Sequence, residues 1–290
     1  MGSVCEFKLY LPNEAEPEPA FSKLESEVLR FENKYTRFKP DSITSTINRA
    51  AGSSKKTRVD EETAQLLNYA DVLHKQSEGL FDITSGILRQ VWDFKSNTLP
   101  TESQLEKILG LISWNKIEWD GSSILLPLKG MEIDFGGYVK EYAADVCATL
   151  CNELNIQHGL INLGGDIRII GPHPDGQSWK VGIQHPRKPN SAIATININK
   201  GAIATSGDYE RFMLVDGKRY CHILNPKTGR SIQPPFAGIS IVAEQCLIAG
   251  SFSTLAMLLS CDTPEWVETC GLPWMAIDQE MKIHGTVDLV

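Results

Sequence analysis

Apolar residues recur at helical spacing through much of the first half of the chain. Phe21, Leu24 and Val28 lie on one helical face, which predicts an amphipathic helix. The sequence Thr101-Glu102-Ser103-Gln104 is typical of a capping box and is expected to begin a short helix. The helices predicted in this half cover residues 20–35, 42–50, 61–77 and 101–110.

The second half is richer in short runs with strand-like alternation, and a further strand is expected over 4–10. The predicted strands are 115–119, 123–127, 159–163, 166–170, 179–184, 193–199, 202–204, 210–215, 218–224, 237–243 and 274–278. The predicted helices are 138–154, 248–260 and 264–270. Because strands and helices do not alternate regularly, the pattern predicts an α+β fold with a largely antiparallel or mixed β-sheet core and packed helices. No internal repeat or long linker is visible, so residues 1–290 are expected to form a single domain.

Composition narrows the classes of function. The 290 residues carry a formal net charge of −8, which argues against a nucleic-acid partner because phosphate neutralisation needs clustered Lys and Arg. No apolar stretch approaches the roughly 20 residues of a transmembrane helix, so no transmembrane segment is expected. The seven cysteines form no CxxC pair, which favours free and mostly buried thiols over a disulfide or metal site.

A Gly-Gly pair precedes one of the predicted helices, in the segment from Asp134 to Lys140. Glycines let a ligand approach the backbone closely, and a helix N-terminus followed by a lysine attracts anions. Asp134 could accept hydrogen bonds from a base or ribose, and Lys140 could contact a pyrophosphate. A plain strand-to-helix turn with a solvent-facing Lys140 explains the same residues equally well.

Four further segments combine small and polar residues, and each also has a structural explanation. In 162–166, Asp166 is expected to cap a bend between two strands. The segment 204–211 is either a pocket wall or a hairpin turn. His222 lies in a strand-like run, where a histidine is usually structural. Thr254 lies near the start of an apolar helix, where it could cap the helix or offer a hydroxyl oxygen to Mg²⁺.

Taken in order, these segments resemble the FAD:protein FMN transferase (ApbE-type) family. The pieces that carry the resemblance cover nearly the whole chain: Met1-Gly2-Ser3, Arg37 to Ser42 with Asn48, Gly79 to Gly86 with Val91 to Phe94, Asp134 to Gly137, Ile161 to Asp166, Trp179 to Gln184, Thr205 to Arg211, and His222-Ile223 with Pro226, Thr228 and Gly229.

The resemblance implies a fold, a reaction and a set of site residues. Members have a T-fold-related architecture, bind FAD and Mg²⁺ (or Mn²⁺), and move FMN onto a Thr or Ser hydroxyl of a target flavoprotein with release of AMP. By position, the implied FAD contacts are Met1, Phe38, Leu80, Phe81, Asp82, Asp134, Lys140, His222 and Ile223. The implied metal positions are Gly137, Gly250 and Thr254. His222 and Lys140 are the candidate catalytic residues, with His222 taking the proton of the acceptor hydroxyl.

Two positions depart from the family pattern. A metal-binding Asp is usual where this chain has Gly250, and a Gly is usual where it has Glu141. The first change removes a charged ligand, so metal affinity is expected to fall unless another carboxylate or the phosphates compensate. The second places a carboxylate beside Lys140. An FAD-binding protein or a slow FAD pyrophosphatase, giving FMN and AMP, is therefore the alternative to a transferase.

The family is often exported as a lipoprotein, with a leader upstream of the Met-Gly segment at which this sequence starts. We therefore expect either a cytoplasmic protein or one whose export signal is missing from this sequence.

Overall fold

The computed structural model describes residues 3–12 and 16–289, and these residues form two compact units. The first unit comprises residues up to 32, 138–209 and 234 onward. The second comprises residues 33–137 and 210–233. Whether the whole chain acts as the single domain expected from the sequence stays a prediction.

A seven-stranded sheet forms the centre of the first unit, in the order β1-β5-β6-β9-β12-β13-β14 within the described residues. Every neighbouring pair in it is antiparallel. The strands are β1 (Cys5–Tyr10), β5 (His158–Leu163), β6 (Asp166–Gly171), β9 (Gly201–Gly207), β12 (Phe236–Ala243), β13 (Trp274–Asp278) and β14 (Ile283–Gly285). The predicted α+β class with a largely antiparallel sheet is confirmed.

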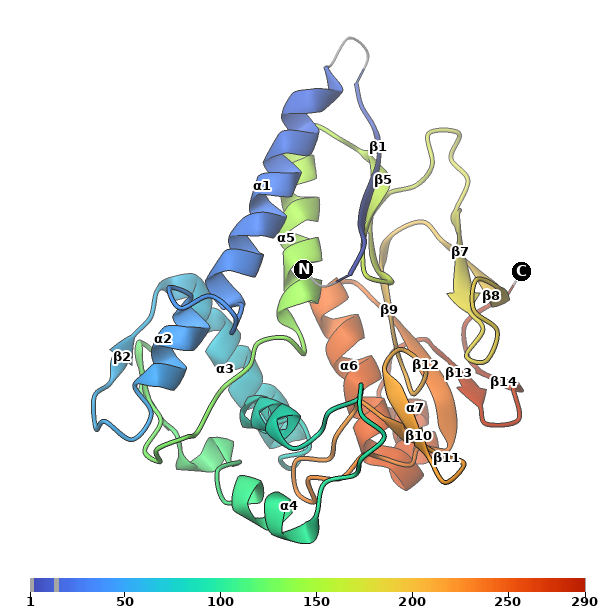
Figure 1. The fold of residues 1–290 in the computed structure, drawn as a ribbon. Coiled ribbons are helices and arrows are strands. Elements are labelled where there is room, and N and C mark those ends of the chain that lie inside the picture. Colours follow the sequence, from blue (N-terminus) through green and yellow to red (C-terminus); the bar gives the residue numbers. More distant parts are fainter. Residues whose placement is uncertain (1–2, 13–15, 290) are drawn as a thin grey trace. The chain divides into compact units, whose positions relative to one another are not determined.

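Helices pack on this sheet, and a separate hairpin covers another part of it (Figure 1). The helix α5 (Val139–Glu153) packs on β5 and β6, and α6 (Cys246–Leu259) packs on β9 and β12. The hairpin of β7 (Trp179–Gln184) and β8 (Ala192–Ile198) shares an apolar cluster with β6, β9 and β13. Small side chains such as Ala202 and Ala204, both fully buried on β9, suit the close approach of a helix.

The second unit is mostly helical. It contains α2 (Ile43–Arg49), α3 (Glu61–Gln76), the 3₁₀ helices η1 (Ile83–Gln90) and η2 (Trp114–Lys116), and α4 (Glu102–Leu109). Its strands are β2 (Thr57–Arg58), β3 (Glu118–Trp119), β4 (Ser123–Leu125), β10 (Phe212–Val215) and β11 (Lys218–Cys221). Ile87, Leu88, Trp92, Ile108 and Met213 make one of its buried clusters.

The remaining helices complete the comparison with the sequence. The helix α1 (Pro17–Tyr35) begins in the first unit, and η3 (Ser260–Asp262) and α7 (Thr263–Thr269) follow α6. The capping box at Thr101 is confirmed, since Thr101 Oγ1 and the Gln104 side chain each bond the other residue's backbone amide. The predictions missed η1, β2 and β14. The predicted strand 115–119 begins within the 3₁₀ helix η2 and has strand structure only at its last two residues, in β3.

The cysteines whose side chains are described, namely Cys5, Cys147, Cys151, Cys221, Cys246 and Cys270, are free thiols. Burial raises the pKa of Cys147 and Cys151 to about 12, so these two thiols are protonated at neutral pH. Within residues 3–12 and 16–289, no helix combines the length and the apolar character needed to cross a membrane.

Candidate functional site

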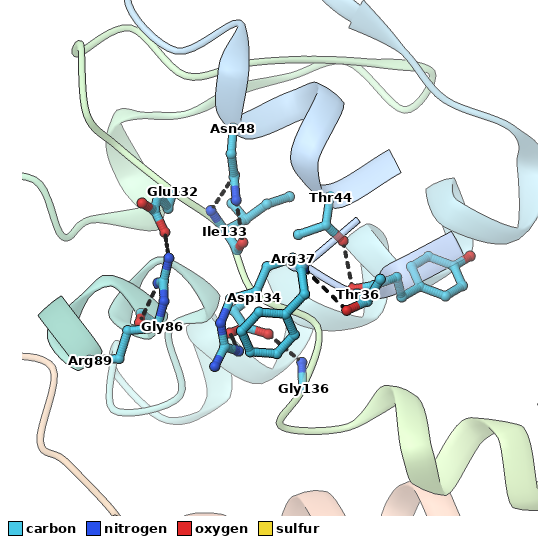
Figure 2. Close-up of polar contacts among 12 residues, drawn as sticks. Thr36, Arg37, Thr44, Asn48, Gly86, Arg89, Glu132, Ile133, Asp134 and Gly136 are labelled. Carbon is cyan, nitrogen blue, oxygen red and sulfur yellow. Dashed lines mark hydrogen bonds and ion pairs between the residues drawn. The ribbon is translucent and has the colours of Figure 1, made fainter. Parts of the chain in front are cut away.

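Asp134 organises a turn in the second unit (Figure 2). Its Oδ1 accepts a hydrogen bond of 2.8 Å from the backbone amide of Gly136, and its Oδ2 lies 2.5 Å from Arg37 Nη1. The guanidinium group of Arg37 also lies 4.6 Å from the ring centre of Phe38. The predicted FAD residue Asp134 therefore holds its own turn, and Arg37 is a neighbour that the site predictions did not name.

Asn48 fixes the segment that precedes this turn. Its side-chain amide donates to the Ile133 carbonyl at 3.0 Å, while its carbonyl oxygen accepts from the Ile133 amide at 2.8 Å (Figure 2). Ile133 belongs to none of the strands in the described part of the chain, and the two bonds to Asn48 satisfy its backbone in place of a strand partner. Asn48 thus ties α2 to the residue that precedes Asp134.

A glycine allows η1 to lie against the same segment. A Cβ atom at Gly86 would lie 2.5 Å from Asp134 Cβ, closer than real side chains approach. The backbone amide of Asp134 donates to the Ile83 carbonyl at 2.9 Å. Position 86 therefore needs a residue without a side chain if Asp134 is to keep its place.

The predicted FAD segment Leu80 to Asp82 enters η1. Asp82 caps this helix, because its Oδ1 accepts from the Thr84 amide at 2.8 Å, and its Oδ2 accepts from the Trp114 amide at 3.0 Å. Phe81 is buried and Leu80 is partly exposed. A pocket of about 500 Å³ opens beside Asp82, with His74, Gly79, Ile112 and Lys227 among its lining residues.

Phe38 has a different character, because 80% of its surface is exposed. A flat ring that rests on the Arg37 guanidinium group can stack against an aromatic ligand. A ligand-contact role for Phe38 stays a prediction.

His222 and Ile223 follow β11. The His222 amide donates to the Arg211 carbonyl at 2.9 Å, and its ring Nδ1 is buried without a hydrogen-bond partner among the described residues. Burial, and then the positive charge of Arg211, lower the pKa of His222 to about 4. The imidazole is therefore neutral at neutral pH.

The first unit holds a compact charged cluster where α5 meets β6. Lys140 Nζ is paired with Asp166 Oδ2 and lies 3.2 Å from Glu141 Oε1. The two carboxylates raise the pKa of Lys140 against the opposing effect of burial. Lys140 is thus a paired cation rather than the solvent-facing lysine of the simpler sequence interpretation.

Asp166 does not cap its own bend, contrary to the sequence interpretation. Asn162 Oδ1 accepts from the Gly165 amide at 2.8 Å and does this instead. Asp166 Oδ1 accepts from the Thr205 amide at 3.1 Å, which joins β6 to β9, while its other oxygen meets Lys140. The Asp166 carboxylate therefore connects Lys140 on α5 to the strands β6 and β9.

Hydroxyl groups line the adjoining face of α6. Ser206 Oγ on β9 lies 3.1 Å from Thr254 Oγ1 and 2.9 Å from Ser253 Oγ. Gly250 is one helical turn before Thr254 and so lies on the same face. A Cβ atom at Gly250 would lie 2.5 Å from Glu141 Cγ, so the Glu141 side chain covers this glycine.

The predicted site residues are therefore divided between the two units. Lys140, Gly250 and Thr254 lie in the first unit. Phe38, Leu80, Phe81, Asp82, Asp134, Gly137, His222 and Ile223 lie in the second. Met1 lies outside the described residues. Among the residues that the structure describes, no group of three His, Cys, Asp or Glu side chains could hold a metal by itself.

Comparisons with known proteins give one family. The model of the ApbE family matches residues 1–274. The FAD:protein FMN transferase of Chlamydia pneumoniae is 31% identical over 248 residues, which are 82% of this chain and 76% of that protein. The ApbE protein of Thermotoga maritima has a similar solved structure, with a TM-score of 0.84, 26% identity, and coverage of 98% of this chain and 97% of that one. The flavin transferase ApbE of Vibrio cholerae shares the fold, with a TM-score of 0.87, 24% identity, and coverage of 99% and 94%.

Proposed function

Since the chain belongs to the ApbE family, we propose that it is an FAD:protein FMN transferase, which moves FMN from FAD to a Thr or Ser hydroxyl of a target flavoprotein. The structural observation that carries the proposal is the Lys140 ammonium group, held by Asp166 and Glu141 at the start of α5. Such a fixed cation, three residues after a Gly-Gly pair, suits a substrate whose reacting part is a diphosphate.

The reaction forms one bond and breaks another at the same phosphorus atom. The acceptor oxygen bonds to the phosphorus of the FMN half, and the bond from that phosphorus to the bridging oxygen breaks. AMP leaves with the electron pair of the broken bond, and the proton of the acceptor hydroxyl passes to a base. Catalysis of this kind depends mainly on positioning and on charge stabilisation.

Lys140 and His222 have distinct roles in this proposal. An ammonium group has three N–H donors. Among the described residues, Asp166 and Glu141 engage two of them, which leaves one for a phosphate oxygen. His222 is neutral and its Nδ1 has no partner within the described part of the chain, so it can accept the hydroxyl proton. Nearby phosphate charge would raise its pKa and strengthen it as a base.

A divalent cation fits the donors of the first unit. Glu141 Oε2 is buried without a hydrogen-bond partner in the described structure, and Glu141 covers Gly250 on α6. Thr254, one helical turn after Gly250, offers a hydroxyl oxygen that lies 3.1 Å from Ser206 Oγ. Oxygen donors of this kind suit Mg²⁺ or Mn²⁺. When bound, the cation neutralises phosphate charge and orients the diphosphate for in-line displacement. The expected contact of the Gly137 backbone with the metal stays a prediction.

The test is transfer of flavin to protein. The purified chain is incubated with FAD, Mg²⁺ or Mn²⁺, and flavoprotein domains that carry a candidate acceptor Thr or Ser, each with an alanine variant at that hydroxyl as control. We expect a mass gain of one FMN, with in-gel flavin fluorescence, only where the hydroxyl is present. AMP release that no domain accelerates would indicate an FAD pyrophosphatase instead. Tight FAD binding that a chelator leaves unchanged, without turnover, would indicate an FAD-binding protein.

A further inference from the structure

Glu141 is an unusual carboxylate for a helix in a protein interior. Only 7% of its surface is exposed, and burial raises the pKa of its carboxyl group, against the opposing charge of Lys140. Its Oε1 lies 3.2 Å from Lys140 Nζ, but Oε2 has no hydrogen-bond partner in residues 3–12 and 16–289. A buried carboxylate oxygen without a partner costs free energy, which a bound cation would offset.

Gly250 and Glu141 occupy a shared space. A Cβ atom built at Gly250 would lie 2.5 Å from Glu141 Cγ, 3.1 Å from Cδ and 3.2 Å from Oε1. A side chain at position 250 would therefore need the volume that the Glu141 side chain fills. The two positions therefore depend on each other: α5 supplies the Glu141 carboxylate, and the absence of a side chain at Gly250 on α6 leaves the volume that Glu141 fills.

The face of α6 that Glu141 covers at Gly250 also has a hydroxyl group of the kind that a hard cation prefers. Thr254 follows Gly250 by one helical turn, and its hydroxyl meets Ser206 at 3.1 Å. Asp166 brings a second carboxylate to Lys140. A divalent cation bound at Glu141 would stabilise the ionised form of this carboxyl group, which the Lys140 ammonium group also favours. With few protein ligands, Mg²⁺ and Mn²⁺ typically complete their coordination with water and substrate phosphates.

We propose that Glu141 supplies the carboxylate ligand of the divalent cation, from α5 and over Gly250, in place of an acidic side chain on α6. This inference rests on the proposed function, because the phosphates of FAD complete the site. Although Gly250 cannot offer the carboxylate ligand that is usual at its position, the chain would then keep such a ligand on another helix, α5. Mn²⁺ affinity should therefore depend strongly on FAD.

The test measures Mn²⁺ binding by electron paramagnetic resonance, with FAD present and without an acceptor protein. Glu141→Gln keeps the size of the side chain and removes its charge, so we expect Mn²⁺ affinity to fall by about tenfold or more. Binding of FAD in excess chelator should change much less. The matched control is Glu153→Gln, an exposed position on the same helix, which should bind Mn²⁺ as the unmodified chain does.

A double variant tests the exchange of position. Glu141→Gly with Gly250→Asp returns the carboxylate to α6, and we expect it to recover most of the Mn²⁺ affinity that Glu141→Gln loses. Unchanged Mn²⁺ affinity in Glu141→Gln, or no Mn²⁺ uptake by the unmodified chain with FAD, would overturn the inference. Glu141-dependent Mn²⁺ binding without any FMN transfer would leave the ligand assignment intact and contradict the proposed function instead.

Discussion

Asp145 on α5 caps the first turn of α6 through Cys246: its Oδ1 accepts from the Cys246 amide at 2.8 Å, and its Oδ2 accepts from the Leu247 amide at 2.9 Å. Asp145 lies one helical turn after Glu141, and Cys246 lies one turn before Gly250. The same pair of helices therefore meets twice, at Asp145 with Cys246 and at Glu141 with Gly250. The cap fixes the register that places Glu141 over the glycine.

Asp145→Ala should destabilise the protein by about 1–2 kcal/mol, because it leaves amides of α6 without their acceptor. Arg168, whose Nε lies 3.0 Å from Asp145 Oδ1, would also lose this ion pair. Urea unfolding measures the effect. Glu153→Ala, at an exposed position of α5, is the control and should leave the unfolding midpoint nearly unchanged. Equal midpoints for the two variants would show that the cap contributes little.

Asn48→Ala should cost about 1–3 kcal/mol of unfolding free energy, since the amide and carbonyl of Ile133 would both lose their partner. The turn at Asp134 follows directly, so FAD affinity should fall as well. Asn152→Ala, which changes an exposed asparagine on α5, should alter neither quantity. Thermal unfolding and flavin fluorescence titration measure the two effects. A loss of stability with unchanged FAD affinity would show that the turn at Asp134 does not contribute to FAD binding.

Much of the fold follows from local patterns. Helix α4 is predictable because the residues of its capping box lie within one turn. Alternation predicts strands such as β7, whose side chains are alternately buried and exposed. The 3₁₀ helix η1 was not predicted. Its cap joins the neighbours Asp82 and Thr84, but Asp82 also accepts from the amide of Trp114, and local spacing does not reveal this distant contact.

The candidate site is harder to predict from the sequence than the fold, because the contacts that position its side chains join segments that are distant in the chain. The sequence identifies Gly250 and Glu141 as two separate departures from a family pattern. Only the folded chain shows that one side chain fills the space of the other. Asp166 was similarly assigned to its own bend, whereas its partners Thr205 and Lys140 come from other elements. Local spacing contains no information about such pairs.

Gly86→Ala should lower both stability and FAD affinity, because the added methyl group would lie 2.5 Å from Asp134 Cβ and push that residue out of its turn. Overpacking of this kind typically costs about 1–3 kcal/mol. Gly110→Ala is the matched control, since a Cβ there would meet its nearest neighbour at an ordinary 3.6 Å. The two variants are compared by urea unfolding and FAD titration. Similar values for both would mean that Asp134 adjusts to the methyl group without loss.

Phe38→Ala should weaken FAD binding without affecting stability. The ring is 80% exposed, so little buried apolar area is lost on truncation. Stacking of an aromatic ring on a base contributes about 1–3 kcal/mol, which corresponds to a loss of roughly tenfold or more in affinity. Val72→Ala removes another exposed apolar side chain from the same unit and serves as the control. If both variants bind FAD alike, Phe38 does not contact the flavin or the adenine.

His222 should make the protein sensitive to acid in a defined range. Its folded-state pKa is about 4, whereas an exposed histidine has a pKa near 6.5. Above pH 6.5 the ring is neutral in both states, so its titration does not affect stability. As the pH falls from about 6.5 to 4, the unfolded chain takes up a proton that the folded chain resists, so stability is lost, by up to about 3 kcal/mol. His222→Gln should abolish this loss, and urea unfolding at pH 7.5 and 4.5 measures it. His284→Gln, at an exposed position, should retain it. An equal loss of stability in His222→Gln and the unmodified chain would place the acid-sensitive group elsewhere.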